Sequence, residues 1–192
     1  MDTFSVLISL FLGIGLAASA GFRVFLPLLA LSIAGYYEYI PLTENWEWIG
    51  SLTAIITLAA ATFLEIFGYY IPWFDNLLDT IALPLATVAG TIVIVATVAD
   101  MDPVVTWALA IIAGGGTASA IKGNAAALRV GSTATTGGIA NPLVTTVETG
   151  TATIMSVASI FIPIVAFIVV LLLFYGIFRF YKKLRKKPSP RP

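Results

Sequence analysis

Four long runs with almost no charge limit what this chain can fold into. Residues 4–20, 81–99 and 151–178 contain no charged side chain, and residues 50–71 contain only Glu65. At about 1.5 Å of rise per residue, each run can cross or nearly cross the ~30 Å hydrocarbon core of a bilayer. Because lipid offers the backbone no hydrogen bonds, uninterrupted apolar runs of this length favour helices. The runs predict an all-α, polytopic transmembrane bundle.

The composition agrees with a chain embedded in a bilayer. Only 10% of the 192 residues are charged and 59% are hydrophobic, whereas soluble domains carry roughly 25% charged residues. The length suits one bundle of about five or six spans of about 20 residues each and leaves no room for a separate soluble domain. We therefore expect a single transmembrane domain over residues 1–181, followed by a basic cytoplasmic tail over residues 182–192.

Missing residue types exclude several classes of function. The chain has no Cys and no His, which removes disulfides, thiol nucleophiles, imidazole bases and the usual zinc and haem ligands. No nucleophile–base pair, phosphate-binding glycine loop or dinucleotide fingerprint is present. We expect no enzymatic activity, no cofactor and no metal centre. Ten basic and ten acidic residues balance, so no basic field points to nucleic acid.

The two ends of the chain predict an orientation. A basic cluster follows the last apolar run and consists of Lys182, Lys183, Arg185, Lys186 and Lys187. Cytoplasmic flanks of spans collect Lys and Arg, so we expect a cell (inner) membrane protein with a cytoplasmic C-terminus and, with five spans, an external N-terminus. The same cluster can also bind anionic lipid headgroups. Asp2 is the only early charge, so the first run lacks the positive start of a signal peptide and we expect it to be retained.

A fifth helix and three less regular segments lie between the runs. The helix is expected to begin at Pro103 and turns rich in small residues after Ile112, which suits either close packing or a broken helix beside a cavity. Residues 22–36 are marginally short for a crossing and either cross or re-enter. Residues 36–50 are aromatic and acidic, as is typical of the headgroup region. Residues 131–150 are rich in Gly, Ser and Thr and predict a linker, in which a short helix or re-entrant segment can form.

Two short stretches repeat one order of features. "GLAASAGFR" (15–23) and "GTASAIK" (116–122) each run from Gly through Ala-Ser-Ala to a basic residue. Each is followed by a Pro- or Gly-interrupted stretch and then by a Glu. Halves 4–71 and 103–178, joined by the helix over 81–99, would then form the inverted repeat of many transporters. Chance recurrence of common small residues is the alternative. Helix breaks or bends are expected at Pro27, Pro72, Gly116 and Pro142.

Five charged residues lie inside or beside apolar segments: Arg23, Glu65, Lys122, Arg129 and Glu148. A charge at the bilayer centre costs about 2.5–3.5 kcal/mol on insertion scales, so such residues pair inside the bundle and often line a pathway. Arg23 keeps its charge under nearly all conditions. Glu65 is its first expected partner, and Glu148 is the other candidate. The alternatives are that the basic side chains reach the interface along their stems and that Glu65 is protonated.

Three further polar residues are candidates for the same site. Asp75 and Asp79 are four residues apart and share a face of a helix. Asp75 either caps a helix that begins at Asn76 or forms a cation site with Asp79 and Glu65; no EF-hand pattern specifies a metal. Asn141 precedes a proline, which disfavours helix there. It either faces a solute from a re-entrant loop or caps an ordinary turn.

Three stretches of the chain resemble a known family: "GFRVFLPLLALSIAG", "LEIFGYYIPWFDNLLDTI" and "AIKGNAAALRVGSTATTGGIANPLVTTVETG". They are similar to small bacterial integral membrane proteins catalogued as domain of unknown function 4126, over roughly residues 10–175. The matching positions are Gly21, Arg23, Phe25, Leu26, Pro27, Glu65, Ile71, Pro72, Asp75, Asp79, Lys122, Arg129, Asn141, Pro142 and Glu148. The family often has Asp-Lys where this chain has Tyr69 and Tyr70, so a mechanism that needs that acid–base pair is not expected here. The resemblance implies a fold and important positions, and no activity.

These observations together predict a small transporter or channel-like protein for an ion or a small solute. Its expected pathway residues are Arg23, Glu65, Asp75, Asp79, Lys122, Arg129, Asn141 and Glu148. One alternative is a non-transporting membrane scaffold in which these charges are structural pairs. Another is a lipid-handling, scramblase-like protein. Stripes of Gly and Ala favour a homo-oligomer, so the expected partners are the bilayer, a second copy of the chain and a small solute or ion.

Overall fold

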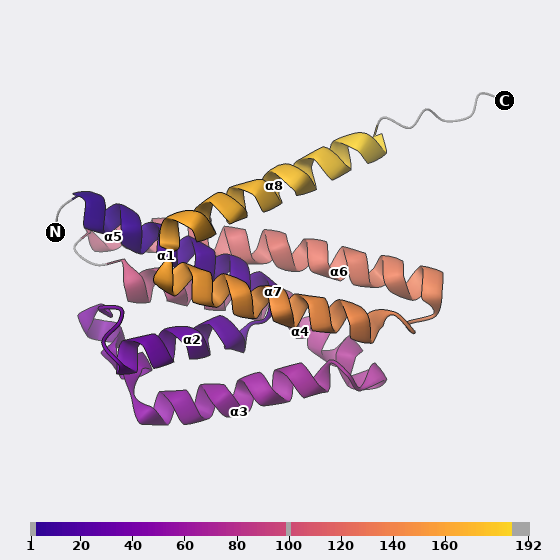
Figure 1. Ribbon diagram of the computed structural model, residues 1–192, viewed down its shortest axis with the longest axis horizontal. Helices are drawn as coiled ribbons and strands as arrows, with labels where there is room; N and C mark the ends of the chain where they lie inside the picture. Colours follow the sequence, from indigo (N-terminus) through magenta and orange to yellow (C-terminus); the bar gives the residue numbers. More distant parts are fainter. Residues whose placement is uncertain (1–2, 99–100, 186–192) are drawn as a thin grey trace.

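The computed structural model describes residues 3–98 and 101–185 and consists of helices joined by short turns (Figure 1). In chain order the elements are α1 (Thr3–Phe22), α2 (Phe25–Tyr36), the 3-10 helix η1 (Glu44–Gly50), α3 (Leu52–Gly68), α4 (Pro72–Thr97), α5 (Pro103–Leu109), the π-helical segment η2 (Ala110–Gly115), α6 (Gly116–Thr136), α7 (Asn141–Phe161) and α8 (Pro163–Arg185). No residue in these two ranges lies in a strand. The predicted all-α class is confirmed.

Five helical segments are long and apolar enough to cross a membrane: Thr3–Phe22, Leu77–Thr97, Pro103–Thr136, Asn141–Phe161 and Pro163–Lys183. A sixth crossing is available if η1 and α3, which are bent by 63° relative to each other, act as one span. These helices indicate a multi-pass membrane protein of about five spans. Two of the predicted spans differ from those observed: residues 50–71 contribute only the 17-residue α3, and residues 151–178 belong to two helices.

The predicted single span over 151–178 is wrong because the chain breaks at Ile162. Its backbone lies at φ −140° and ψ 64°, and α8 begins at the next residue, Pro163. A residue before proline avoids helical backbone, while proline itself suits the first turn of a helix. No polar residue marks this turn, so hydropathy alone merges α7 with α8.

The predicted linker over 131–150 is also wrong, because most of it is helical. α6 continues to Thr136, and α7 starts at Asn141 after a turn in which Gly137 and Gly138 have positive φ angles of 63° and 88°. Glycine adopts such angles without a steric penalty. The Thr-rich composition does not prevent a helix in α7, because the hydroxyls donate to carbonyls one turn earlier: Thr146 to Pro142, Thr149 to Thr145 and Thr153 to Thr149.

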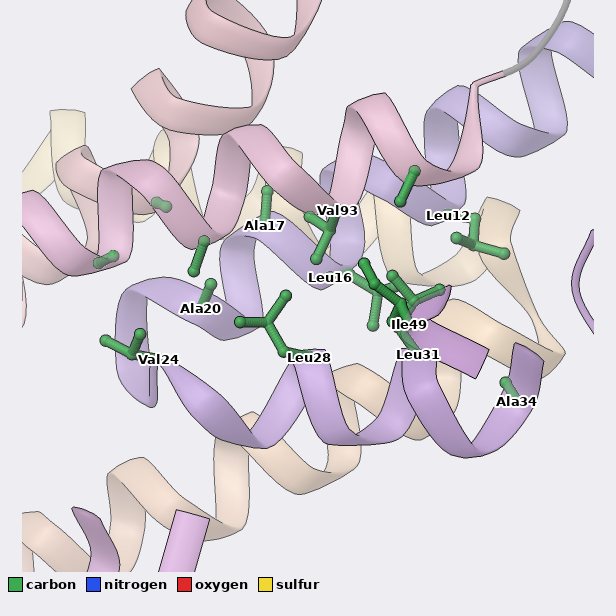
Figure 2. Close-up of a cluster of buried hydrophobic side chains, with 14 of the residues drawn as sticks. Leu12, Leu16, Ala17, Ala20, Val24, Leu28, Leu31, Ala34, Ile49 and Val93 are labelled. Carbon is green, nitrogen blue, oxygen red and sulfur yellow. The ribbon is translucent and has the colours of Figure 1, made fainter. Parts of the chain in front are cut away.

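α1 and α2 form a helical hairpin whose tip lies inside the bundle. The chain turns at Arg23 and Val24, so that α2 runs back along α1 (Figure 2). Leu16 of α1 and Leu31 of α2 are fully buried in the apolar cluster that the two helices share. The 12 residues of α2 span about 18 Å, too short to cross the bilayer. Residues 22–36 therefore do not form a full span of their own, and Pro27 sits in the first turn of α2.

Small residues allow close helix contacts, as expected, although one predicted break is absent. A side chain at Gly21 would meet Ala118 and Ile121, so the two Ala-Ser-Ala stretches pack on each other, and a side chain at Gly114 would meet the carbonyl of Gly90. At Gly116 the π-helical η2 changes to the α-helix α6, and the helical segment runs on to Thr136 without a broken stretch. The second half of the proposed repeat therefore has a change of helix type at Gly116 but no break like that at Arg23 and Val24, and the relation between the two halves stays a prediction.

The other predicted breaks lie at helix starts, and α8 extends further than expected. Pro72 begins α4, and Pro142 is the second residue of α7. α8 leaves the bundle at an angle (Figure 1) and is fixed near its start by stacking of Phe11 on Phe167, with ring centres 4.3 Å apart. It continues to Arg185, beyond the predicted boundary at residue 181. In the predicted headgroup cluster Lys182 and Lys183 are exposed, Arg185 ends the helix, and Lys186 and Lys187 lie outside the described residues.

Candidate functional site

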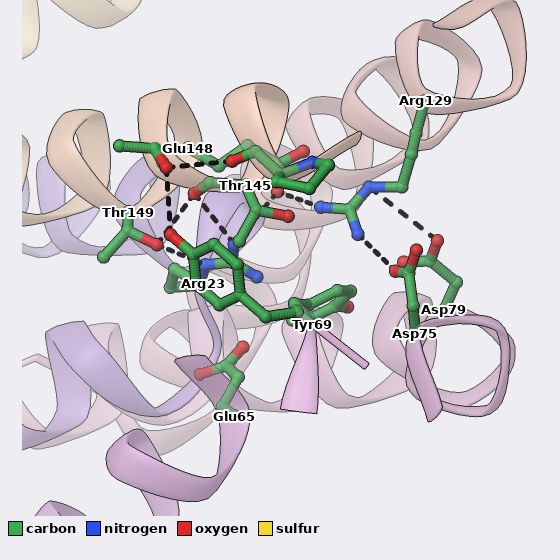
Figure 3. A network of polar contacts seen from close by, with 12 residues as sticks. Arg23, Glu65, Tyr69, Asp75, Asp79, Arg129, Thr145, Glu148 and Thr149 are labelled. Carbon is green, nitrogen blue, oxygen red and sulfur yellow. Dashed lines mark hydrogen bonds and ion pairs between the residues drawn. The ribbon is translucent and has the colours of Figure 1, made fainter. Parts of the chain in front are cut away.

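The ionisable residues predicted for the pathway converge in one place in the bundle (Figure 3). Three are cations and four are carboxylates: Arg23, Lys122, Arg129, Glu65, Asp75, Asp79 and Glu148, called here the charge network. Six of them are at most 6% exposed, and the side chain of Asp79 is 27% exposed. The sequence therefore predicted which charges are buried together.

Arg23 lies at the tip of the α1–α2 hairpin and is fully buried. Its Nε donates to Thr149 Oγ1 at 2.9 Å, and its Nη2 donates to the carbonyl of Thr145 at 3.0 Å. The same Nη2 lies 3.4 Å from Glu148 Oε2. Arg23 thus docks the hairpin tip onto α7 through one ion pair and two hydrogen bonds.

Glu65 is not the ion-pair partner that the sequence suggested for Arg23. Its two carboxylate oxygens accept the backbone N–H groups of Val24, at 2.7 Å, and Phe25, at 3.0 Å. The first N–H groups of a helix have no partner within the helix, and their partial positive charge favours a carboxylate. Glu65 of α3 therefore caps the N-terminus of α2 inside the bundle, and Glu148 takes the role predicted for it.

Arg129 connects α6 with both α4 and α7. Its Nη1 donates to Asp75 Oδ1 at 2.6 Å, its Nε lies 3.8 Å from Asp79 Oδ2, and its Nη2 donates to Glu148 Oε2. Glu148 Oε2 therefore joins the two guanidinium groups of Arg23 and Arg129. Asp75 lies in the first turn of α4, which begins at Pro72, so its predicted role as the cap of a helix from Asn76 is wrong.

Tyr69 is the central residue that the sequence did not indicate. It lies in the turn between α3 and α4 and is 3% exposed. The guanidinium carbons of Arg23 and Arg129 are each 4.3 Å from its ring centre, and Lys122 Nζ is 5.1 Å away. Lys122 also donates to its hydroxyl at 3.1 Å. An aromatic ring attracts cations by its quadrupole, so Tyr69 holds three cations close together. The only hint in the sequence was that Tyr69 and Tyr70 stand where the family often has Asp-Lys.

Three polar atoms beside this network have no hydrogen-bond partner among the described residues. They are Arg23 Nη1, Thr145 Oγ1 and Glu148 Oε1, and all three residues are buried. Arg23 Nη2 and Glu148 Oε2 are already in ion-pair contact, so covalent geometry places the free atoms of both groups in the same region. Unsatisfied buried polar groups are costly and rare in folded proteins. Efficient packing alone therefore does not explain the polar groups in this part of the bundle.

The charge network opens on one side into a pocket of about 310 Å³. Its lining comes from α4, α6 and the start of α7 and consists of Asp75, Asp79, Arg129, Val130, Thr133, Ala134 and Asn141. The Asn141 amide donates to Thr133 Oγ1 at 3.1 Å, so Asn141, at the first position of α7, faces the pocket. Of the pathway residues predicted from the sequence, four line the pocket, namely Asp75, Asp79, Arg129 and Asn141, and four belong to the charge network without lining it, namely Arg23, Glu65, Lys122 and Glu148.

The fold and this site define a class: a multi-pass helical membrane protein with a short second helix folded back on the first and a buried network of paired charges. The chain belongs to the family described as Domain of unknown function (DUF4126), whose profile matches residues 10–183. No curated protein and no solved structure matches the chain. The resemblance noted from the sequence is confirmed, and the family name carries no activity.

Proposed function

We propose that this protein is a small transporter or channel-like protein that moves an ion or a small solute through the charge network. The observation that supports this most directly concerns Arg129. Its guanidinium is 4% exposed and contacts three carboxylates, yet it also lines the open pocket. A buried charge that a small solute can approach from outside is what a binding site within a membrane requires.

The broken α1–α2 hairpin supports the same proposal. In many transporters the solute site lies where a membrane helix is interrupted, because the interrupted backbone supplies polar groups at membrane depth. Here the chain is interrupted at Arg23, a member of the charge network, and the N-terminus of α2 at this interruption is bound by Glu65, another member. The apolar cluster around Leu12, Leu16 and Leu31 fills the hairpin away from its tip. The polar site is thus open on the pocket side and sealed by packed side chains along the hairpin.

Stability alone is a weak reason for so many buried charges. Replacing a buried ion pair by apolar residues of similar volume is often neutral or stabilising, and charges at membrane depth are costly unless they serve a function. Seven ionisable groups in one site, the three cations and four carboxylates named above, therefore favour a role in binding over a role in holding the bundle together.

The test is solute entry into proteoliposomes. Purified protein is reconstituted, the vesicles are shifted into sodium chloride, potassium chloride, urea, glycerol or glycine, and entry is followed by stopped-flow light scattering. We expect at least one probe to enter faster than in protein-free vesicles, and Arg129→Gln to slow that entry at least tenfold. Glu47→Gln, at an exposed site on η1, is the matched control and keeps full flux. If folded Arg23→Ala and Glu65→Gln variants also keep full flux, the charge network is not the pathway.

A non-transporting scaffold that assembles into homo-oligomers is the second candidate, and one observation favours it. Gly116, Gly123 and Gly131 of α6 have no atom within 4 Å of where a side chain would begin, so part of α6 presents bare backbone outward. Small residues of this kind let membrane helices approach closely. The scaffold predicts that Gly123→Leu changes the oligomeric state by light scattering, and that no probe crosses the membrane.

A further inference from the structure

The last part of α8 is not packed on the bundle. Closer to its start the helix is held by Val170, which is 1% exposed and belongs to a buried cluster with residues of α1, α6 and α7. Phe174 is the last residue of α8 that packs against this cluster, and from there to Lys183 no side chain is buried. α8 leaves the bundle at an angle (Figure 1). Residues 175–183, called here the α8 arm, are therefore open to the surroundings.

The cations of the α8 arm share one face of the helix, and that face points away from the bundle. Arg179 is followed three and four residues later by Lys182 and Lys183, a spacing that places the three side by side. Arg179 is also nine residues from the buried Val170, which is two and a half turns, so the two lie on opposite sides of α8. All three cations are exposed, α8 contains no acidic residue, and none of the three forms an ion pair among the described residues.

The opposite side of the α8 arm is apolar and uncovered. Ile177 is seven residues from Val170, almost two full turns, so it continues the side of α8 that faces the bundle. Phe180 and Tyr181 flank this line and are 55% and 46% exposed. The arm is thus the amphipathic end of a helix that is long and apolar enough to span a membrane. At such an end aromatic side chains lie at headgroup level, and basic side chains extend to the phosphates.

We propose that the α8 arm is a docking site for anionic phospholipid. The headgroup phosphates bind Arg179, Lys182 and Lys183, and the acyl chains cover the apolar side around Ile177. Charge complementarity identifies this occupant, because three cations with no carboxylate on their helix attract anionic lipid and repel the same three cations on a second copy of the arm. The inference is independent of the transport proposal, since no residue of the arm belongs to the charge network or lines the pocket.

The test compares two lipids on the intact protein. Full-length protein in a non-ionic detergent is mixed with equal amounts of phosphatidylglycerol and phosphatidylcholine with the same acyl chains, and native mass spectrometry gives the ratio of the two bound lipids. We expect phosphatidylglycerol to be preferred. One cation near an anionic surface contributes about fivefold to affinity, so the double variant Lys182→Gln, Lys183→Gln should reduce this preference at least fivefold. The matched control Lys182→Arg, Lys183→Arg keeps both charges and should keep the preference.

A further variant tests the apolar side of the arm. Phe180→Ser removes an apolar contact and no charge, so it should lower the total amount of bound lipid and leave the ratio of the two lipids unchanged. Because no side chain of the arm is buried, every variant should keep the wild-type thermal midpoint, which is measured alongside.

Three results would overturn the inference. The first is equal binding of the two lipids by the wild type, and the second is an unchanged preference in the folded double variant Lys182→Gln, Lys183→Gln. The third is a change of oligomeric state on Phe180→Ser, seen by light scattering, with no loss of bound lipid, since the arm would then contact a second copy of the chain. Displacement of phosphatidylglycerol by an equal concentration of free glycerol phosphate would also contradict it, because a lipid site needs the acyl chains.

Discussion

Removing the charge of Glu148, the only charged residue of α7, should destabilise the protein strongly. Its Oε2 is shared by the guanidinium groups of Arg23 and Arg129. Arg129 keeps Asp75 and Asp79 when Glu148 becomes Gln, but Arg23 is left without a carboxylate within ion-pair distance among the described residues. Breaking a buried pair by removing one partner costs about 3–5 kcal/mol. Because Gln keeps the shape and one acceptor oxygen, we expect about 3 kcal/mol for Glu148→Gln.

Thermal unfolding in detergent micelles is the assay. One kcal/mol corresponds to about 2–4 °C for a chain of 150–250 residues, so Glu148→Gln should lower the midpoint by roughly 6–12 °C. Glu47→Gln removes the same charge from an exposed position of η1 and should stay within about 0.5 kcal/mol of the wild type. Equal midpoints for the two variants would refute the reasoning.

A double-mutant cycle separates the ion pair from other effects of the substitution. Arg23→Met removes the cation and keeps an apolar side chain of similar length, so the pair Arg23→Met and Glu148→Gln leaves no isolated charge between α1 and α7. We expect the double variant to lose at least about 1 kcal/mol less than the sum of the single variants, the size of coupling seen for contacting residues. Strict additivity would show that Arg23 and Glu148 do not stabilise each other.

Two smaller predictions concern an unpartnered hydroxyl and a tight helix contact. Thr145→Val removes a buried hydroxyl that has no partner among the described residues. Because such an unpaired group costs about 1–3 kcal/mol, the variant should unfold at the wild-type midpoint or above it. A midpoint several degrees lower would contradict this. Gly114→Ala places a methyl group against the carbonyl of Gly90 and should lower the free energy of unfolding by about 1–3 kcal/mol. The control is Gly123→Ala, where the space is open, and it should be neutral or stabilising by up to about 1 kcal/mol. Both are checked by the same thermal scan.

The membrane class and the set of buried charges follow from the sequence because one physical rule governs both. Long uncharged runs require a bilayer, and a charge within such a run requires a partner. Arg23, Glu65, Lys122 and Glu148 could therefore be expected to meet without knowledge of the tertiary structure. Which acid meets which base could not be predicted, because it depends on the turn at Val24, where backbone N–H groups compete successfully for Glu65.

The misplaced boundaries have a different cause. In water, a turn between helices is marked by polar residues, but the turn at Ile162 lies in apolar sequence and is set only by Pro163. Conversely, the Thr-rich start of α7 has the composition of a loop, although its hydroxyls bond to the helix itself. Tyr69 was missed because an aromatic residue near a helix end is typical of the headgroup region. Only its position against Arg23 and Arg129 shows that it belongs to the site.

The contacts also separate the part of the charge network that the fold needs from the part that it does not. The break before α2 leaves N–H groups that lipid cannot satisfy, and Glu65 meets that need whether or not a solute is present. Arg23 then secures the hairpin tip to α7. The fold does not need Asp79 in the same way, because Asp75 and Glu148 already hold Arg129. The Asp79 carboxylate adds only a weak contact to Arg129 and a further negative charge at the edge of the pocket. A residue that contributes little to the fold and is accessible to solute is where a functional substitution should act with the least effect on stability. Asp79→Asn, rather than Glu65→Gln, is therefore the variant that best distinguishes function from folding.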